Sequence, residues 1–473
     1  MAHPLLASDH DAATPIFAVT PESLATASSA LSEAACAFAA AQGFEPKAGN
    51  HCLLPRADGG LEAVLFGVDP ASAKRPDPFI AGKLPTVLPD GAYRLEGAWP
   101  EPALATLAWL LGGYRFEHYR EPAKKRVRLV PPRGVDAEEV SRIAEAVTLG
   151  RDLVNTPAND LGPEEIEAAA LRLAEKHGAQ VESIVGDELL AQNFPMIHAV
   201  GRASPRAPRL IDLRWGDEAA PRVAIVGKGV AFDTGGLNIK PETGMALMKK
   251  DMAGAAAALA LADMVMGAGL HLHLRVLVPA VENAISGSAF RPGDVLKSRK
   301  GLTVEIGNTD AEGRLILADA LALADEEAPE IIVDFATLTG AARVALGPDL
   351  PPFYTQDDAL AADLSRLGEA VNDPVWRMPL WPPYAKLLES KIADVNHISG
   401  GPFAGSVTAA LFLTRFVEKA KSYAHFDIYG WTPAAKPGRP EGGEVQGARV
   451  IYAILKERFG RGHLPAPAPN VIG

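Results

Sequence analysis

Cysteine is almost absent from this chain: its 473 residues include only two, Cys36 and Cys52. Two thiols are too few for a disulfide framework or for a zinc site built from thiolates, so both classes are excluded. A low cysteine content is typical of a reducing compartment. The N-terminal sequence also lacks the basic segment and apolar run of a secretory signal. We therefore expect a cytoplasmic protein.

Positive charge and long apolar runs are scarce as well. The chain has 46 lysines and arginines against 58 aspartates and glutamates, a formal net charge of −12. This balance argues against a nucleic-acid partner, and the only basic cluster is Lys124 to Arg133. The longest apolar run, Ala253 to Leu270, is mostly alanine and contains Asp263, so it predicts a buried helix and no membrane span.

Familiar catalytic motifs are missing too. The sequence has no HExxH zinc helix, no GxSxG nucleophile elbow, no GxxxxGKS or GxxxxGKT phosphate loop and no GxGxxG loop. The enzyme classes that depend on these motifs are therefore disfavoured.

The apolar pattern predicts an α/β protein, with a larger C-terminal domain whose largely parallel central sheet is flanked by helices, preceded by a smaller α/β N-terminal domain. We expect the N-terminal domain over residues 1–133, a connecting helix and linker over 134–160, and the larger domain over 161–473. In the larger domain, strands are predicted over 222–226, 272–278, 302–306, 331–335 and 424–428, and helices over 164–176, 253–266, 315–324 and 407–417.

Acidic side chains follow the predicted strands, where ligands usually bind in parallel sheets. Four of them lie in or beside glycine-containing loops: Asp233, Asp251, Asp310 and Glu312. Because like charges a few ångströms apart repel, bringing the four together requires cations. Two divalent metal ions would neutralise them and activate a bridging water for attack on a carbonyl or phosphoryl group. Lys240 and Arg314 would then face the anions of the reaction.

Each of these residues also has a purely structural interpretation. The segment Thr309 to Glu312 fits a helix capping box, Asp251 can complement a helix dipole, and Asp233 with two glycines can form a turn. Lys228 and Lys240 can be ordinary solvated lysines. Taken singly, these interpretations equal or outweigh the functional ones, but they do not explain why all of these residues cluster at strand ends.

Several segments resemble the leucine (cytosol) aminopeptidase family of two-zinc exopeptidases. The string NTDAEGRL at 308–315 is similar to the family signature, and GKGVAFDTGGLNIKP at 227–241 with MKKDMAGAA at 248–256 is similar to its other metal-binding segment. RDLVNTPAND, DFATLTGAA, ADVNHISGGPFAGSVTAALFL and AHFDIYGW are similar as well, so the resemblance runs from about residue 110 to about residue 450. One departure is His397, where the family pattern has a small amide side chain.

The resemblance implies a dinuclear metallopeptidase domain with Zn²⁺ or Mn²⁺ and specific roles for the clustered residues. The implied metal ligands are Lys228, Asp233, Asp251 and Glu312 on one ion and Asp233, Asp310 and Glu312 on the other. Lys240 would stabilise the oxyanion, and Arg314 would hold a bicarbonate that acts as general base. The implied substrate-binding residues are Met248, Asn308, Thr337, Leu338 and Gly340.

The function implied is removal of the N-terminal residue, by preference an apolar, leucine-like one, from peptides with a free N-terminus. The resemblance also implies a homohexamer. Two other hypotheses stay open at this point: a bimetallic phosphoesterase that uses the same carboxylates, and a non-catalytic, DNA-binding role of the assembled hexamer. The phosphoesterase requires more cations near the site than Lys240, Lys249, Lys250 and Arg314, and the net charge of −12 disfavours DNA binding.

Overall fold

The computed structural model describes residues 3–8, 10, 12–122 and 126–460, which divide into two compact units. The first unit contains residues 1–148 and 432–441, and the second contains residues 149–431 and 442–473. Helix α5 (Ala137–Asn155) passes through the first boundary, where a connecting helix is predicted. The two-residue strands β18 (Trp431–Thr432) and β19 (Gly442–Gly443) lie at the other two boundaries. Part of the basic cluster, Lys124 and Lys125, falls outside the described residues.

The first unit is built on a five-stranded mixed sheet of order β2-β3-β1-β4-β5. β1 pairs in parallel with β3 and β4, β4 pairs in parallel with β5, and β2 is antiparallel to β3. The strands are β1 (Thr14–Val19), β2 (His51–Pro55), β3 (Leu61–Gly67), β4 (Gly91–Gly97) and β5 (Val127–Val130), and the helices are α1 (Leu24–Ser28), α2 (Glu33–Ala41), η1 (Ile80–Lys83), α3 (Leu84–Val87) and α4 (Pro102–Gly112).

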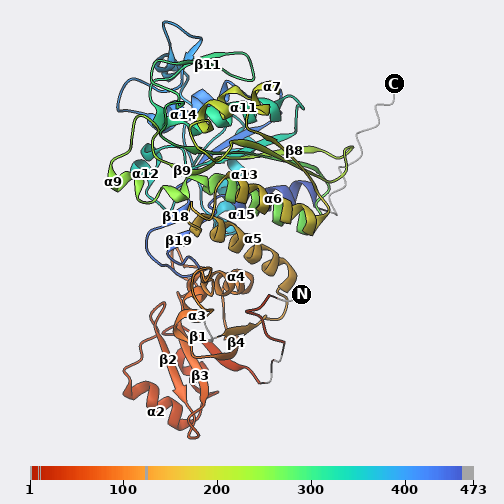
Figure 1. Ribbon diagram of the computed structural model, residues 1–473. Helices are drawn as coiled ribbons and strands as arrows, with labels where there is room; N and C mark the ends of the chain where they lie inside the picture. The colour runs from red at the N-terminus through yellow and green to blue at the C-terminus, as the bar shows by residue number, and fades with distance from the viewer. Residues whose placement is uncertain (1–2, 9, 11, 123–125, 461–473) are drawn as a thin grey trace, which may run out of the picture. The chain divides into compact units, whose positions relative to one another are not determined.

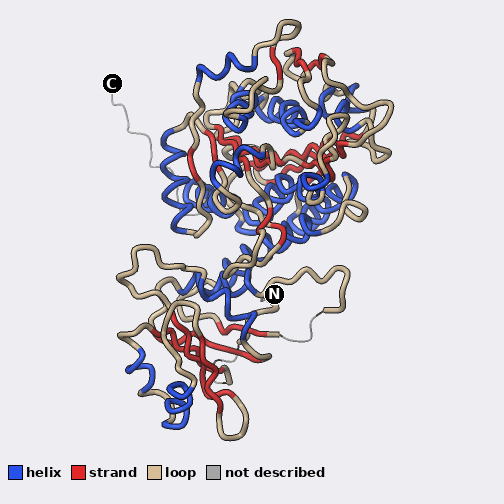
Figure 2. The backbone as a smooth tube through the Cα atoms, turned by 90° about the vertical axis from the view of Figure 1, so that its left-hand side faces the viewer, coloured by secondary structure: helices blue, strands red, loops and turns tan. Residues whose placement is uncertain are grey.

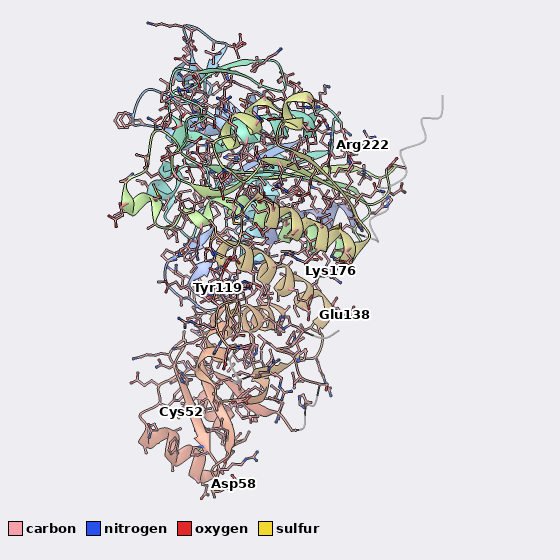
Figure 3. The ribbon with its side chains drawn as sticks, viewed as in Figure 1. Cys52, Asp58, Tyr119, Glu138, Lys176 and Arg222 are labelled. Carbon is pink, nitrogen blue, oxygen red and sulfur yellow. The ribbon has the colours of Figure 1, made fainter. Side chains whose placement is uncertain are left out.

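Alternating apolar residues place one face of this sheet against α2. Val19, Leu54 and Leu65 from three strands pack with Ala35 of the helix, whose small side chain allows the close approach. Cys52 lies on β2 within the same cluster (Figure 3), as a buried free thiol. The other free thiol, Cys36, is partly exposed and donates to Ser28 O at 3.5 Å.

The second unit contains a nine-stranded sheet of order β15-β14-β17-β13-β8-β10-β7-β6, with β9 pairing to β10. Its centre, β17-β13-β8-β10, is parallel, and antiparallel pairs begin at β14 and β7. The strands are β6 (Gln180–Val185), β7 (Arg209–Trp215), β8 (Arg222–Gly227), β9 (Gly229–Asp233), β10 (His273–Asn283), β13 (Ile331–Ala336), β14 (Pro352–Tyr354), β15 (Trp376–Arg377) and β17 (Tyr423–Asp427). A separate three-stranded sheet contains β11 (Val295–Lys297), β12 (Thr303–Glu305) and β16 (Val395–Asn396).

Helices cover both faces of the large sheet, which runs edge-on between two helical layers in Figure 2. One layer contains α6 (Pro163–His177), α10 (Ala253–Ala268), α13 (Asp358–Ala370) and α15 (Ala448–Phe459), and the other contains α8 (Pro195–Gly201), α11 (Gly313–Asp325) and α14 (Gly405–Thr414) (Figure 1). The shorter helices are α7 (Glu188–Ala191), α9 (Glu242–Met245), η2 (Met248–Met252), η3 (Thr309–Ala311), α12 (Gly340–Leu346) and η4 (Pro382–Leu388). The predicted α/β class, with a larger unit built on a largely parallel sheet, is confirmed.

The alanine-rich helix α10 is a core element. The stretch Met248–Ala268 has the length and hydropathy of a membrane span, but 89% of that window is buried inside the protein. Its small side chains let the helix lie close to β8 and β13. The prediction of a buried helix is therefore confirmed.

Strand β10 is longer than the sequence pattern predicts, and this places one more residue at the site. The expected strand ended at residue 278, whereas β10 continues to Asn283 because its second half pairs with β9. The apolar pattern did not predict this extension, because the last two residues of β10, Glu282 and Asn283, are polar.

The contact between α10 and the sheet depends on Gly254. A Cβ at this position would lie 2.2 Å from the carbonyl oxygen of Phe335 and 2.8 Å from the amide nitrogen of Lys228. We expect Gly254→Ala to push the helix off these strand ends and to lower the stability of the second unit by about 1–3 kcal/mol. The midpoint of thermal unfolding measures this effect.

Gly287→Ala is the matched control, because no atom lies within 4 Å of a Cβ built at Gly287. This control should change stability by less than about 0.5 kcal/mol. Equal midpoints for the two variants would show that the close approach at Gly254 is not a packing constraint.

Candidate functional site

The carboxyl ends of the parallel strands bring polar side chains together, some of them predicted from the sequence and some not. Lys228 directly follows β8, Asp233 ends β9, Asn283 ends β10, Thr337 directly follows β13 and Asp427 ends β17. Adjacent parallel strands end at the same edge of a sheet, so these five side chains converge although they are up to two hundred residues apart in sequence.

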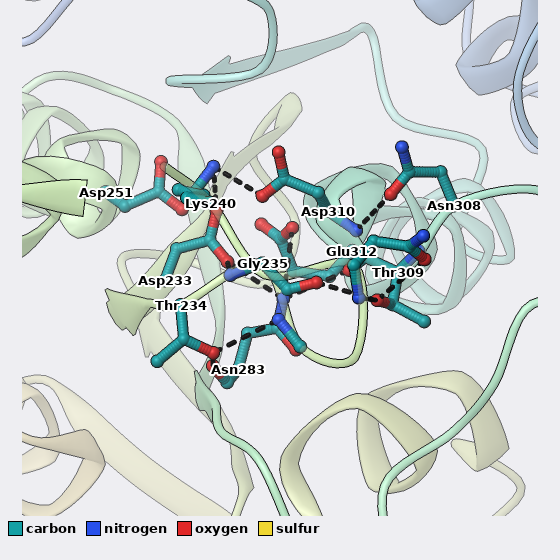
Figure 4. Close-up of polar contacts among 12 residues, drawn as sticks. Asp233, Thr234, Gly235, Lys240, Asp251, Asn283, Asn308, Thr309, Asp310 and Glu312 are labelled. Carbon is teal, nitrogen blue, oxygen red and sulfur yellow. Dashed lines mark hydrogen bonds and ion pairs between the residues drawn. The ribbon is translucent and has the colours of Figure 1, made fainter. Parts of the chain in front are cut away.

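A tight loop carries the chain from Asp233 to Lys240. Gly235 has φ +88°, and a Cβ there would lie 2.5 Å from the carbonyl oxygen of Asn238, so the turn requires glycine. Gly235 N donates to Asp233 Oδ1 at 2.9 Å, and the hydroxyl of Thr309 donates to Gly235 O at 2.7 Å and accepts from Asn238 N at 2.8 Å. Thr309 thus fastens the loop to the segment that carries Asp310 and Glu312 (Figure 4).

These contacts decide between the open interpretations of two motifs. Thr309 does not form the capping box, because its hydroxyl bonds the neighbouring loop; Asn308 instead caps η3, accepting from Asp310 N at 2.8 Å. Asp233 does form the turn considered from sequence, but its second oxygen, Oδ2, lies 2.8 Å from Lys240 Nζ. The turn and a functional role are therefore compatible.

Lys228 is buried among carboxylates. Its Nζ lies 2.7 Å from Asp251 Oδ2 and 3.0 Å from Glu312 Oε1, and it donates to Thr337 O at 3.0 Å. Burial alone would lower the pKa of the Lys228 ammonium, but the charges of Asp251 and Glu312 outweigh this and raise the pKa above its ordinary value. Thr337 also fixes the Asp251 carboxylate, since its hydroxyl donates to Asp251 Oδ1 at 2.7 Å.

Lys240 makes the second bridge between carboxylates. Its Nζ lies 2.8 Å from Asp233 Oδ2 and 2.5 Å from Asp310 Oδ1, as Figure 4 shows. The pKa of Lys240 is raised because these two charges outweigh the effect of burial. Lys228 and Lys240 are therefore not ordinary solvated lysines, and each joins a different pair of acidic residues.

The carboxylate oxygens have the arrangement that a metal ion needs. Asp233, Asp310 and Glu312 each offer an oxygen, and the three oxygens lie within 4.8 Å of one another. Among the described residues, no hydrogen bond of regular geometry reaches the buried oxygens Asp251 Oδ2, Asp310 Oδ1 and Glu312 Oε1, although each has a lysine nitrogen within 3.0 Å. Oxygen lone pairs that face positive charge without a hydrogen bond are suited to metal coordination.

The proximity of these carboxylates shifts their pKa values. Burial and the charge of Asp251 raise the pKa of Asp233 to about 6, and burial and the charge of Asp233 raise the pKa of Glu312 to about 7. Burial also raises the pKa of Asp310. All three changes favour the protonated form, so the full negative charge of the cluster develops only near neutral pH.

Arg314 lies deeper than the sequence pattern predicts. It is buried at the start of α11, its Nη1 donates to His397 O at 2.8 Å, and its Nε has no hydrogen-bond partner within the described part of the chain. His397, the departure from the family pattern, holds the loop beside it: Gly307 N donates to His397 Nδ1 at 3.2 Å, and His397 Nε2 donates to Asn308 O at 2.9 Å. Burial lowers the pKa of His397 to about 3, so this histidine stays neutral.

A cavity of about 400 Å³ opens next to the carboxylates. Among the predicted substrate-binding residues, the ones that line it are Met248, Thr337, Leu338 and Gly340. Asn308 is not one of its described lining residues and instead caps η3. Lys228, Asp233, Lys240, Asp251 and Asp310 line the cavity, while Glu312 and Arg314 are buried and are not among its described lining residues.

Sequence reasoning missed two residues of the site, Asn283 and Asp427, and gave no catalytic or binding role in the aminopeptidase to a third, Lys250. Asn283 donates to Asp233 Oδ1 at 2.8 Å and to Thr309 O at 3.0 Å, so one amide holds both carboxylate loops. Asp427 accepts from the amide nitrogens of Leu338 and Thr339, both at 3.0 Å, and so holds the loop after β13. Lys250 is buried and lines the cavity. Asp427 lies near the end of the predicted strand 424–428, which was a signal in the sequence, whereas Asn283 lies beyond the predicted end of its strand at residue 278.

Fold and site together define a class. Acidic residues and a lysine converge at the carboxyl edge of a mostly parallel α/β sheet, beside a cavity, with oxygen atoms positioned for metal ions. The protein is a metal-dependent hydrolase.

Within that class the chain belongs to the cytosol aminopeptidase (M17) family: residues 148–452 match its catalytic domain and residues 14–132 match the M17 N-terminal domain. A probable cytosol aminopeptidase of Roseiflexus castenholzii is 41% identical over 373 residues, covering 75% of this chain and 76% of the relative. The crystal structure of cytosol aminopeptidase from Coxiella burnetii is 44% identical, with a TM-score of 0.91 and coverage of 96% of this chain and 98% of that one. The bottromycin maturation enzyme BotP in complex with Mn is 31% identical, with a TM-score of 0.84 and coverage of 94% and 99%.

These findings confirm the family that the sequence motifs resemble. The chain is a metal-dependent aminopeptidase that acts on peptides. The phosphoesterase and DNA-binding hypotheses receive no support from them.

We expect Asn283→Leu to loosen the site without changing any charge. The substitution removes the three buried hydrogen bonds that Asn283 Nδ2 donates to Asp233 Oδ1, Thr309 O and, at 3.5 Å, Glu312 Oε2, which costs about 1–3 kcal/mol. The thermal midpoint should fall, and it should stay unchanged in Asn159→Leu, where the replaced residue is exposed. Equal thermal midpoints for the two variants would show that the Asn283 amide does not hold the two carboxylate loops in place.

Proposed function

We propose that the chain hydrolyses the N-terminal peptide bond in the cavity described above, with two divalent metal ions per chain. The observation that carries this proposal is the convergence of Asp233, Asp310 and Glu312 within 4.8 Å beside the buried Lys228. One ion would be held by Lys228, Asp233, Asp251 and Glu312, and the other by Asp233, Asp310 and Glu312. Bound there, the ions would supply Lewis acidity and lower the pKa of water.

Lys228 has to give up a proton to act as a ligand. Its neighbours Asp251 and Glu312 now stabilise the ammonium form, so a metal ion must replace the positive charge that Lys228 supplies to them. On metal binding this proton would leave Nζ for solvent, because Asp251 and Glu312, both within 3.0 Å, would have to be ionised to bind the metal. Metal affinity should therefore depend on pH.

Lys240 would keep its proton and stabilise the oxyanion. Asp233 and Asp310 raise its pKa, and its Nζ lies at the wall of the cavity, where a scissile carbonyl would lie. Arg314 would hold a bicarbonate as general base, and its unpartnered buried Nε supports an anion at that place.

Substrate binding follows from the same arrangement. The free α-amine of the peptide would lie against Asp251, and the backbone groups of Thr337, Leu338 and Gly340 would bind the chain of the substrate. Met248 would contact the first side chain, and Asn308 would act indirectly by positioning Asp310.

Metal identity, assembly and location are further parts of the proposal. Zn²⁺ and Mn²⁺ both suit a site rich in carboxylates, and the Mn in the BotP complex supports the second. The family resemblance implies a homohexamer, and exposed apolar side chains of the second unit, including Val344 and Phe403, are available for contacts between its subunits. The word "cytosol" in the names of the relatives supports a cytoplasmic location.

Replacing Lys240 separates catalysis from metal binding. Lys240→Ala should lower kcat by about 100- to 1000-fold, because an oxyanion donor is lost, while about two metal ions per chain are retained. Steady-state hydrolysis of leucyl 4-nitroanilide and elemental analysis of the same sample measure both quantities. Lys297→Ala, at an exposed lysine of β11, is the control. Loss of metal in Lys240→Ala would contradict the role assigned to this lysine.

The raised pKa values of Asp233 and Glu312 predict how metal stabilisation depends on pH. A carboxyl whose folded-state pKa is raised binds more protons when folded, so the metal-free protein loses stability as pH rises from about 4 toward 7. Metal ions bind the ionised form, so the increase in melting temperature caused by Mn²⁺ should be larger at pH 7.5 than at pH 5.5. An equal increase at both pH values, or an unchanged pH dependence in Asp233→Asn, would contradict this assignment.

A further inference from the structure

One positive side chain of the cavity has no part in the chemistry proposed above. Lys250 is only 4% exposed, yet it lines the cavity. Within the described ranges of the chain its ammonium makes no ion pair and no hydrogen bond, unlike Lys228 and Lys240. A buried ammonium without a partner is costly, so its presence on a cavity wall points to a ligand that provides the partner.

An aromatic ring and a second cation lie beside Lys250. Its Nζ is 4.6 Å from the centre of the Tyr429 ring, and the Arg343 guanidinium is 5.0 Å from the same ring. All three residues line the cavity. Cations stack on the faces of aromatic rings, so both positive groups lie within 5.0 Å of the centre of the Tyr429 ring, which does not neutralise either of them.

The carboxylates of the cavity do not neutralise this pair. Asp251 is bound by Lys228 and Thr337. Asp427 accepts from Leu338 N and Thr339 N through Oδ1, and from the hydroxyls of Thr339 and Ser406 through Oδ2. The cavity is therefore lined by carboxylates that pair with Lys228 and Lys240, and by a second set of positive groups, Lys250 and Arg343.

We propose that Lys250 and Arg343 bind the side-chain carboxylate of an N-terminal aspartate or glutamate, which makes acidic residues the preferred first residues of the substrate. This inference rests on the proposed function, because it takes Asp251 as the anchor of the α-amine. Lys250 is next to Asp251 in sequence and shares a 3₁₀ helix with Met248, so it lies where the first side chain has to extend. The preference differs from the apolar one that the family resemblance implies.

The test compares four aminoacyl 4-nitroanilides, of glutamate, aspartate, leucine and lysine, with the metal-loaded wild-type protein. This leaving group has no carboxylate, so only the first side chain can supply the anion. We expect kcat/KM for the glutamyl or aspartyl substrate to exceed that for the leucyl substrate by about tenfold or more, and the lysyl substrate to be the poorest.

Substitutions show which side chain causes the preference for acidic first residues. Lys250→Met should lower kcat/KM for acidic substrates by about 10- to 100-fold and change that for the leucyl substrate by less than about threefold. Lys250→Arg should keep the preference, and the exposed Arg343 can be replaced by glutamine with little risk to folding. Lys249→Met is the matched control: the neighbouring Lys249 donates to Asn155 O at 2.6 Å and is not among the residues that line the cavity.

The possible failures are distinguishable. If the leucyl substrate is hydrolysed, but acidic substrates are not preferred and do not respond to Lys250→Met, the inference is wrong while the aminopeptidase function stands. If Lys250→Met weakens hydrolysis of Leu-Gly but not of Leu-Gly amide, the lysine binds the far carboxylate of short peptides and the inference is also wrong. If no anilide or peptide is hydrolysed, the proposed function itself fails.

Discussion

The second unit depends on one electrostatic constraint: four carboxylates are held together at the edge of a sheet. Such a cluster is unfavourable unless positive charge lies between its members. In the structure, Lys228 joins Asp251 to Glu312, and Lys240 joins Asp233 to Asp310. The turn at Gly235, the hydroxyl of Thr309 and the amide of Asn283 then fix the loops that carry these groups.

The balance of charge explains why this site suits a hydrolase. Two ammonium groups leave the four ionised carboxylates with two negative charges, and burial together with this excess raises the pKa values of Asp233 and Glu312. Two divalent ions, with Lys228 neutral and Lys240 charged, would turn the net charge slightly positive. A positive, largely buried site favours a reaction in which negative charge develops on oxygen. The scarcity of cysteine fits the same picture, since oxygen atoms and one amine provide the ligands.

The sequence predicts the class of fold and the carboxylate cluster, because both depend on local patterns. Strand β8 and helix α10 follow from runs of apolar residues, and the family motifs contain Asp233, Asp310 and Glu312 within short segments. Asn283 escapes prediction because β10 extends only through its pairing with β9. The roles of Lys250 and Arg314 depend on which way each side chain turns, toward the cavity or toward His397, and no spacing in the sequence encodes that direction.

Anomalous diffraction from crystals grown with Mn²⁺ shows directly whether the carboxylate cluster binds a pair of metal ions. We expect two anomalous peaks per chain, both between the side chains of Asp233 and Glu312, with Lys228 Nζ beside one and Asp310 beside the other. A single peak, or peaks away from these carboxylates while the enzyme is active, would contradict this expectation.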